Sequence, residues 1–176
     1  MVHSLELVFD DDTDATVIAE MNALADAGLR NPHRDQRPHV TLVAAPTISP
    51  AALTALAPAA QRLPITVLLG APIVFSPDGA DRGYVVARSV VPSAELLGIQ
   101  STVVRLAADH VDGAFDHSRP GGWSPHVTVA RRLSVDRLGP ALEILSTAAD
   151  RPAVVTGIRL WDGEAKTETV LPGRAC

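Results

Sequence analysis

The chain has 176 residues, of which 47% are hydrophobic and only 3% are aromatic. This length predicts a single domain over 1–176, with two small lobes over about 1–78 and 82–176 and a largely aliphatic core. The net charge of −5 argues against a protein that binds duplex DNA.

The sequence carries no sign of membrane insertion or export. Its apolar stretches are shorter than the roughly 20 residues that a membrane-spanning helix needs. The N-terminus, MVHSLELVFDDD, lacks the basic stretch and the apolar stretch of a signal peptide. The one cysteine, Cys176, cannot form an internal disulfide, which is typical of a reducing compartment. We therefore expect a cytoplasmic protein that is a monomer and has no membrane partner.

The first half is predicted to follow the order strand, helix, strand, helix, strand. Acidic residues at 11–14 can cap a helix whose apolar positions recur at helical spacing, and Gly28 can end it. Pro50 favours the first turn of a second helix. The expected strands are 5–9, 37–43 and 65–75, and in the last of these Gly70 and Pro72 predict a bulge or bend.

The second half is predicted to repeat this order. Apolar residues at helical spacing predict one helix around 96–106 and another around 138–145, with Ser134 as a cap for the second. Strands are expected over 83–88, 125–131 and 153–161, and 166–171 is expected to close a hairpin through Asp162-Gly163.

The tetrapeptide Pro-His-Val-Thr occurs at 38–41 and again at 125–128, and it opens the second strand of each half. This repetition in matching places marks an internal duplication. Because side chains alternate along a strand, the imidazole and the hydroxyl of each copy project to one face. These groups belong to His39 and Thr41 in the first copy, and to His126 and Thr128 in the second. If a pseudo-two-fold axis relates the lobes, both pairs face one cleft.

Two histidines that face each other suit acid–base catalysis. An unperturbed imidazole has a pKa of about 6.5, so near neutral pH one ring can be neutral while the other is protonated. The neutral ring can take a proton from water or a hydroxyl, and the protonated ring can give one to a leaving oxygen. The threonine hydroxyls can bond phosphate oxygens, and arginines gather near both copies. A duplication kept for packing is the alternative, but imidazole and hydroxyl groups are poor packing choices.

The motifs HVTL at 39–42 and HVTV at 126–129 resemble the His-x-Thr-x (HxTx) motifs of the two-histidine (2H) phosphoesterase superfamily. The segment RPGGWSPHVTVAR at 119–131 is similar to the pattern of its bacterial branch, the 2′-5′ RNA ligase or RNA 2′,3′-cyclic phosphodiesterase family. The resemblance spans essentially the whole chain. It implies an α+β, bilobal fold whose two pseudo-symmetric β-α-β-α-β lobes line a central cleft with antiparallel sheets.

The resemblance also implies an enzyme, a hydrolase that opens a 2′,3′-cyclic phosphate to a 2′-phosphate without a metal or cofactor. Its substrate would be an RNA end or a small nucleotide, and the reverse reaction would be 2′-5′ ligation. By position, His39 would give a proton to the leaving oxygen and His126 would activate water, although the chemistry alone permits either assignment. Thr41 and Thr128 would hold the phosphate.

Three further residues near the second motif are candidates for substrate contact. Arg119 and Arg131 can contact phosphate or the nucleic-acid backbone. Trp123, two residues before the motif, either stacks on a base or anchors its loop, and the anchor is favoured.

No metal site or ATP site is predicted. The pairs His33 with His39 and His110 with His117 could be imagined as metal ligands. The sequence, however, contains no HExxH motif, no cysteine pair and no tight carboxylate cluster. Lys166, the only lysine, is not part of a glycine-rich phosphate loop.

Two other interpretations stay open. One is a module that binds RNA ends or a nucleotide without turning it over. The other is the same chemistry on a different phosphodiester, such as a cyclic ADP-ribose phosphate or a linear 2′-5′ oligonucleotide. The negative net charge and modest arginine content favour a short or small substrate, since binding to a long duplex relies on many phosphate contacts.

Overall fold

The computed structural model describes residues 2–29, 37–76, 83–146 and 150–174. The strands are β1 (His3–Phe9), β2 (His39–Ala45), β3 (Thr47–Ile48), β4 (Ile65–Phe75), β5 (Tyr84–Val90), β6 (Val111–Asp112), β7 (His126–Leu133), β8 (Arg151–Asp162) and β9 (Thr167–Pro172). The helices are α1 (Asp11–Asp26), α2 (Ala52–Ala55), α3 (Ala57–Ala60), α4 (Ala94–Leu106) and α5 (Val135–Ser146), with 3₁₀ turns η1 (Ala108–His110) and η2 (Asp116–Ser118). Both halves thus follow the predicted order, with short extra elements between.

The ends of helix α1 follow from local chemistry. The side chain of Asp10 accepts a hydrogen bond from the backbone N–H of Thr13 and caps the helix, one residue before the predicted acidic segment. Gly28, at φ 74°, takes the left-handed conformation that ends it, as predicted. The helix expected after Pro50 is two short helices, α2 and α3. Pro58 lacks the backbone N–H that would continue α2 into one longer helix.

All the strand pairs are antiparallel, which confirms the predicted α+β class. The main sheet has seven strands in the order β2-β1-β8-β4-β5-β7, with β9 paired to β8, and β3 pairs with β6 separately. The pairing of β8 with β4 joins the two groups of strands edge to edge into one sheet. The register of β4 against β5 shifts between Leu69 and Pro72, so the predicted irregularity in β4 is confirmed.

The two halves exchange their last long strands. β8, from the second half, lies between β1 and β4, while β4, from the first half, pairs with β5 of the second half. The ranges 1–78 and 82–176 therefore separate the two repeats along the chain. That they also form two separate lobes in space stays a prediction. The exchange brings residues near the two ends of the sequence, on β1 and β8, into direct register.

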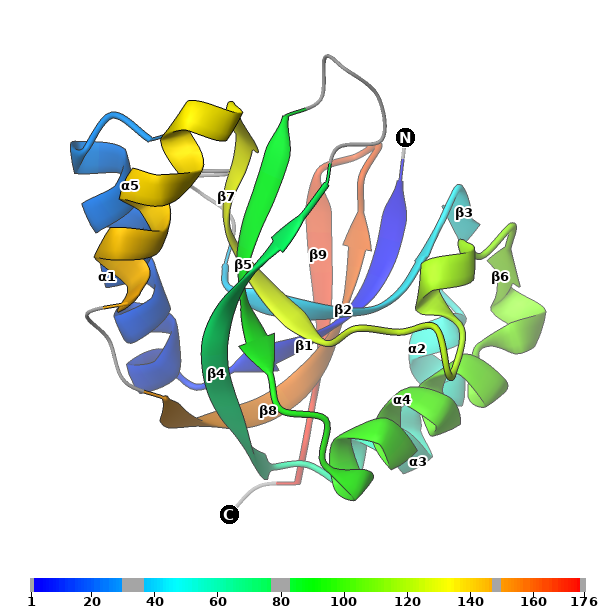
Figure 1. The fold of residues 1–176 in the computed structure, drawn as a ribbon. Helices are drawn as coiled ribbons and strands as arrows, with labels where there is room; N and C mark the ends of the chain where they lie inside the picture. Colours follow the sequence, from blue (N-terminus) through cyan, green and yellow to red (C-terminus); the bar gives the residue numbers. More distant parts are fainter. Residues whose placement is uncertain (1, 30–36, 77–82, 147–149, 175–176) are drawn as a thin grey trace.

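Helices cover the apolar faces of the sheet. Figure 1 shows α1 and α5 together beside β5 and β7, and α2, α3 and α4 grouped on the side of β2. The core between them is aliphatic, as the composition predicts, and consists mainly of Leu, Val, Ile and Ala with Phe9 buried among them. No helix in the described ranges combines the length and the hydrophobicity needed to cross a membrane.

The strands at the two ends of the sheet order meet. β2 contacts β7, although five pairings separate them along the sheet (Figure 1). A sheet whose first and last strands touch must be strongly curved, in line with the twist of antiparallel strands. Both strands that carry Pro-His-Val-Thr are thus brought together.

Candidate active site

The two motif strands bury one face and leave the other polar. Val40 and Leu42 on β2 are fully buried, as are Val127 and Val129 on β7. His39, Thr41 and His126 are half-buried, whereas Thr128 is 9% exposed. Burial therefore alternates as predicted in β2, whereas in β7 Thr128 is buried together with the valines on either side of it.

His39 is held by the backbone just before it. Its Nδ1 lies 3.0 Å from the carbonyl oxygen of Arg37. A carbonyl oxygen only accepts hydrogen bonds, so Nδ1 carries a proton. Nε2 is therefore the nitrogen available for proton transfer. Arg37 is fixed in turn, because its guanidinium donates to the side chain of Asp14 and to the backbone oxygen of Phe9.

His126 repeats this arrangement. Its Nδ1 lies 2.7 Å from the carbonyl oxygen of Ser124, again two residues earlier, so Nε2 is again the uncommitted nitrogen. The ring of Phe75 lies 4.6 Å from the imidazole, measured between centroids, and is tilted by 50°. The repeated tetrapeptide thus holds both rings with a proton on Nδ1, and Nε2 of each ring is available for proton transfer.

The electrostatic surroundings of the two rings differ. Burial lowers the pKa of His126 below its usual value, the hydrogen bond to Ser124 opposes this, and the positive charges of Arg131, His39 and His117 lower it further. His126 is therefore biased toward its neutral form. The mutual influence of His39 and His126 also places the two imidazoles within electrostatic reach of each other.

His39 instead faces a carboxylate. Its Nε2 lies 3.5 Å from Oε1 of Glu6, on the neighbouring strand β1. Glu6 is 2% exposed, and the same Oε1 accepts a hydrogen bond of 2.5 Å from the hydroxyl of Ser4. The sequence analysis missed Glu6. The signal was present, because Glu6 is the single acid inside the apolar strand LELVF, and a buried acid requires a partner.

Arg159 neutralises Glu6 from the other side. This arginine is fully buried on β8, directly opposite Glu6 in the strand register. Its Nε donates to Oε2 of Glu6 at 2.7 Å, and its Nη2 donates to the same oxygen. Its Nη1 donates to Oε2 of Glu168 on β9 at 2.6 Å. A chain of charges, His39–Glu6–Arg159–Glu168, therefore crosses four neighbouring strands.

Thr128 and Arg131 are brought together by a β-bulge. Against β5, Thr128 pairs with Ala87 while Ala130 pairs with Val86, so β7 has one extra residue there. The extra residue shifts the alternation by one, and Nη2 of Arg131 lies 3.5 Å from the hydroxyl of Thr128. Burial lowers the pKa of Arg131, and the charge of Glu6 opposes this, so Arg131 also lies within reach of Glu6.

The other two predicted contact residues lie differently. The indole N–H of Trp123 donates to the carbonyl oxygen of Thr41 at 2.8 Å, and the ring packs against the core. This bond ties the loop before β7 to strand β2 and fits the anchor interpretation. Arg119 is exposed and pairs with Asp116 at 3.2 Å. Contact of either residue with a substrate stays a prediction.

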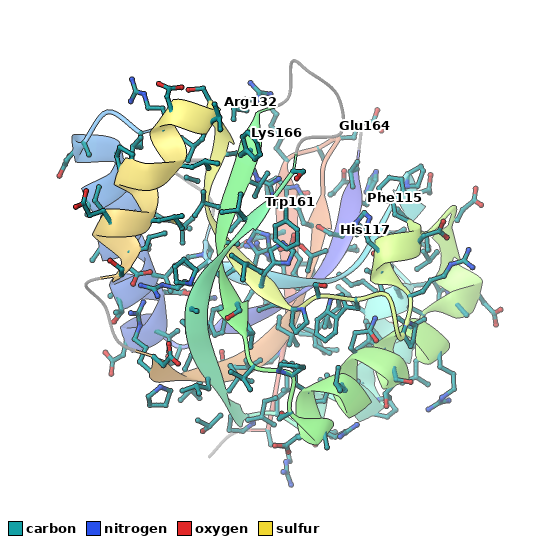
Figure 2. All side chains as sticks on the ribbon, viewed as in Figure 1. Phe115, His117, Arg132, Trp161, Glu164 and Lys166 are labelled. Atoms are coloured by element: carbon teal, nitrogen blue, oxygen red, sulfur yellow. The ribbon has the colours of Figure 1, made fainter. Side chains whose placement is uncertain are left out.

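Trp161 is a second aromatic residue that the sequence analysis did not single out. It is half-buried on β8, two residues from Arg159 and therefore on the same face, and the Arg159 guanidinium lies 5.9 Å from its ring centre. Figure 2 shows Trp161 near the centre of the view, between β5 and the segment that carries Phe115 and His117. Within the described part of the chain its indole N–H has no hydrogen-bond partner.

Of the histidines considered as metal ligands, His39 contacts Glu6. His33 lies outside the described residues. The ring of His117 stacks on Phe115, with centroids 5.6 Å apart. Among the residues that the structure describes, no group of three or more His, Cys, Asp or Glu side chains is arranged to hold a metal ion.

Comparison with known proteins adds a family and a shared fold. A family described as the 2′-5′ RNA ligase superfamily matches residues 9–167. The structure is similar to that of Escherichia coli LigT complexed with 3′-AMP, with a TM-score of 0.56, 16% identity, and 98% of this chain and 94% of that chain covered.

Two further structures agree with it. Kluyveromyces marxianus Usb1 has a TM-score of 0.53 at 15% identity, over 97% of both chains. TT0787 of Thermus thermophilus has a TM-score of 0.53 at 18% identity, over 97% of this chain and 95% of that one. These likenesses show the fold. No curated protein sequence matches the chain.

Proposed function

Because the chain belongs to the 2′-5′ RNA ligase superfamily, we propose that it is a metal-independent phosphodiesterase that opens 2′,3′-cyclic phosphates to 2′-phosphates. Membership of this family supports the processing of phosphodiesters. The substrate that we propose is the cyclic phosphate of an RNA end or of a small nucleotide. A cytoplasmic location and a monomeric state stay predictions.

One observation carries the proposal. Two histidines on strands that meet both commit Nδ1 to a backbone carbonyl, yet they have opposite surroundings. A carboxylate faces Nε2 of His39, whereas burial and positive charges act on His126. A pair with one member favoured as a proton donor and the other as a proton acceptor is what acid–base cleavage of a phosphodiester needs.

In the proposed reaction, Nε2 of His126 takes a proton from a water molecule as its oxygen attacks phosphorus. The bond from phosphorus to the 3′ oxygen breaks, and Nε2–H of His39 gives its proton to that oxygen. The product is a 2′-phosphomonoester with a free 3′ hydroxyl. His126 takes up one proton and His39 delivers one, so the two rings exchange protonation states. Proton exchange with the solvent then restores the starting state of each ring. The same steps with a 5′ hydroxyl in place of water would form a 2′-5′ linkage, and their reverse would break that linkage and close the cyclic phosphate.

The phosphate would be held by groups that need no metal. The hydroxyls of Thr41 and Thr128 can donate to non-bridging oxygens, and Arg131 beside Thr128 can add a charge-assisted bond. We propose that Arg119, which is exposed and paired with Asp116, contacts a part of the substrate outside the reacting phosphate.

The substrate class is supported by the structural neighbours and by the charge of the chain. LigT has been crystallised with 3′-AMP, and K. marxianus Usb1 with uridine monophosphate. The net charge of −5 favours a small nucleotide or a short RNA end over a long duplex.

The direct test is incubation of the EDTA-treated protein with a nucleoside 2′,3′-cyclic monophosphate and with a short RNA that ends in this group. We expect a 2′-phosphate product from at least one of them, and no product from the His126→Ala variant. Folded protein that yields no product from either would contradict the proposal. A nucleotide that raises the melting temperature without turnover would then support the binding module.

A second prediction concerns the pH dependence of His126. The charge of Arg131 lowers the pKa of His126, so replacing Arg131 by glutamine should raise that pKa. Since the base must be neutral, the acidic limb of the kcat/KM profile should move to higher pH. Arg132→Gln is the matched control, because it removes an equal charge from the next residue. An acidic limb that stays in place in Arg131→Gln would contradict this electrostatic assignment.

A third prediction separates a nucleotide from a phosphodiester without a base. The chain has two tryptophans, and Trp161 is the one whose indole N–H is unengaged among the described residues. In a Trp123→Phe variant, a nucleoside 2′-phosphate should change the fluorescence of Trp161, whereas inorganic phosphate should not. Trp161→Ala should weaken nucleotide binding by about 1–3 kcal/mol if the base stacks on it. No response in Trp123→Phe, with turnover intact, would indicate a substrate that lacks a base at this position.

A further inference from the structure

We propose that Glu6 is a positioning residue that makes His39 the proton donor of the pair. The carboxylate receives the Nε2–H of His39 between turnovers and keeps the proton on that nitrogen until a leaving oxygen competes for it. The proposal deepens the two-histidine chemistry above and rests on it for its kinetic part only.

The hydrogen-bonding capacity of the His39 ring determines which nitrogen can give up a proton. Nδ1 of His39 is committed to the carbonyl oxygen of Arg37, so it carries a proton in either charge state. If Nε2 were bare, its lone pair would face the carboxylate oxygen of Glu6 at 3.5 Å, and the two would repel. With a proton on Nε2 the same geometry becomes a weak, charge-assisted contact that a substrate oxygen can replace.

The carboxylate is held in place by groups that do not titrate near neutral pH. Ser4 donates to the oxygen that faces His39, and Arg159 donates twice to the other oxygen. Glu6 and Arg159 are both almost fully buried, so their attraction is weakly screened. Glu6 is therefore fixed to within one rotamer, and its position relative to the imidazole does not depend on solvent.

Arg159 also explains how a carboxylate can lie beside a phosphate site. An unpaired carboxylate there would repel a phosphate, whereas the adjacent guanidinium of Arg159 offsets the charge of Glu6, and its second partner, Glu168, is partly exposed to water. Its oxygen still acts on His39 at close range. The other charged groups around His39 are Arg131 and His126 from β7 and, behind Arg159, Glu168 from β9. Glu6 is the only carboxylate among the described residues that lies within 4.0 Å of His39.

The kinetic test compares Glu6→Gln with Glu168→Gln. Glutamine keeps the size of Glu6 and removes its charge. The control makes the same change at Glu168, which contacts Arg159 instead of His39 and is 43% exposed. In Glu6→Gln, kcat should fall about tenfold while KM changes little, because the carboxylate that faces Nε2–H of His39 is lost and the phosphate-binding groups remain. The acidic limb, which belongs to His126, should stay in place. A loss that appears mainly in KM would indicate a structural role and would overturn the proposal, as would the same loss of kcat in Glu168→Gln.

A second measurement does not depend on turnover. In the ¹⁵N-labelled wild-type protein at about pH 6, NMR should show an Nε2–H signal of His39 that exchanges slowly with water, because Glu6 accepts that hydrogen. In Glu6→Gln this signal should exchange faster, since a neutral amide oxygen is the weaker acceptor, while the Nδ1–H signal held by the carbonyl oxygen of Arg37 should persist. If Glu6→Gln does not fold, the wild-type signal is the test, and its absence from folded wild-type protein would overturn the proposal. A protected Nε2–H in a protein that turns over no cyclic phosphate would refute the proposed function and leave the role of Glu6 standing.

Discussion

Replacing His126 by alanine is expected to reduce kcat/KM for a cyclic phosphate by about 10²–10⁴-fold, and His39→Ala should do the same. Each ring holds one of the two protons that move in the proposed reaction. Neither side chain is needed for the core, since both are half-buried on the polar faces of β2 and β7. Both variants should therefore fold, as circular dichroism and thermal unfolding would show.

The double variant sharpens this prediction. Removing both histidines should cost little beyond either single replacement, because groups that act as a unit are not additive. His110→Ala, at the half-buried end of η1, is a matched control that should keep full activity. Retention of more than a tenth of the wild-type kcat/KM by either single variant would count against the two-histidine scheme.

The largest expected effect on stability comes from Arg159. Arg159→Met should reduce the free energy of unfolding by about 3–5 kcal/mol, because it leaves the buried carboxylate of Glu6 without its cation. For a chain of this size, such a loss lowers Tm by roughly 10 °C. Thermal unfolding followed by circular dichroism measures it directly.

Glu168→Gln provides the comparison for that measurement. It removes the other carboxylate that Arg159 contacts, but this partner is partly exposed and leaves the pair with Glu6 intact. A change within about 1 kcal/mol is expected for a partner that water can replace. The prediction would be contradicted if Arg159→Met unfolded at the same temperature as Glu168→Gln. The buried pair of Glu6 and Arg159 would then stabilise the fold no more than a well-packed apolar side chain does.

The sequence was most informative where its signal is local. Strand alternation predicted that Val40, Leu42, Val127 and Val129 face the core, and all four are buried. The end of α1 at Gly28 and the irregularity of β4 were also predictable, because each depends on the conformational limits of one or two residues. The break between α2 and α3 has an equally local cause in Pro58, which the sequence analysis overlooked.

The surroundings of the histidines were not predictable in this way. Glu6 and Arg159 are 153 positions apart, and they pair because β8 inserts beside β1 when the halves exchange strands. Nothing in the spacing of two residues so far apart indicates that register. The position of Trp161 beside Arg159 has the same origin, since both residues lie on β8.

By itself, the sequence determined the repeated tetrapeptide, the two His-x-Thr pairs and, through them, the resemblance that the family match confirms. These features lie in short segments whose side-chain directions follow from strand alternation alone. The tertiary structure alone decided that β2 and β7 meet and that a buried carboxylate faces one imidazole while positive charges face the other. Electrostatic interactions depend on distance in space, and that distance is set by the pairing of strands from opposite ends of the chain.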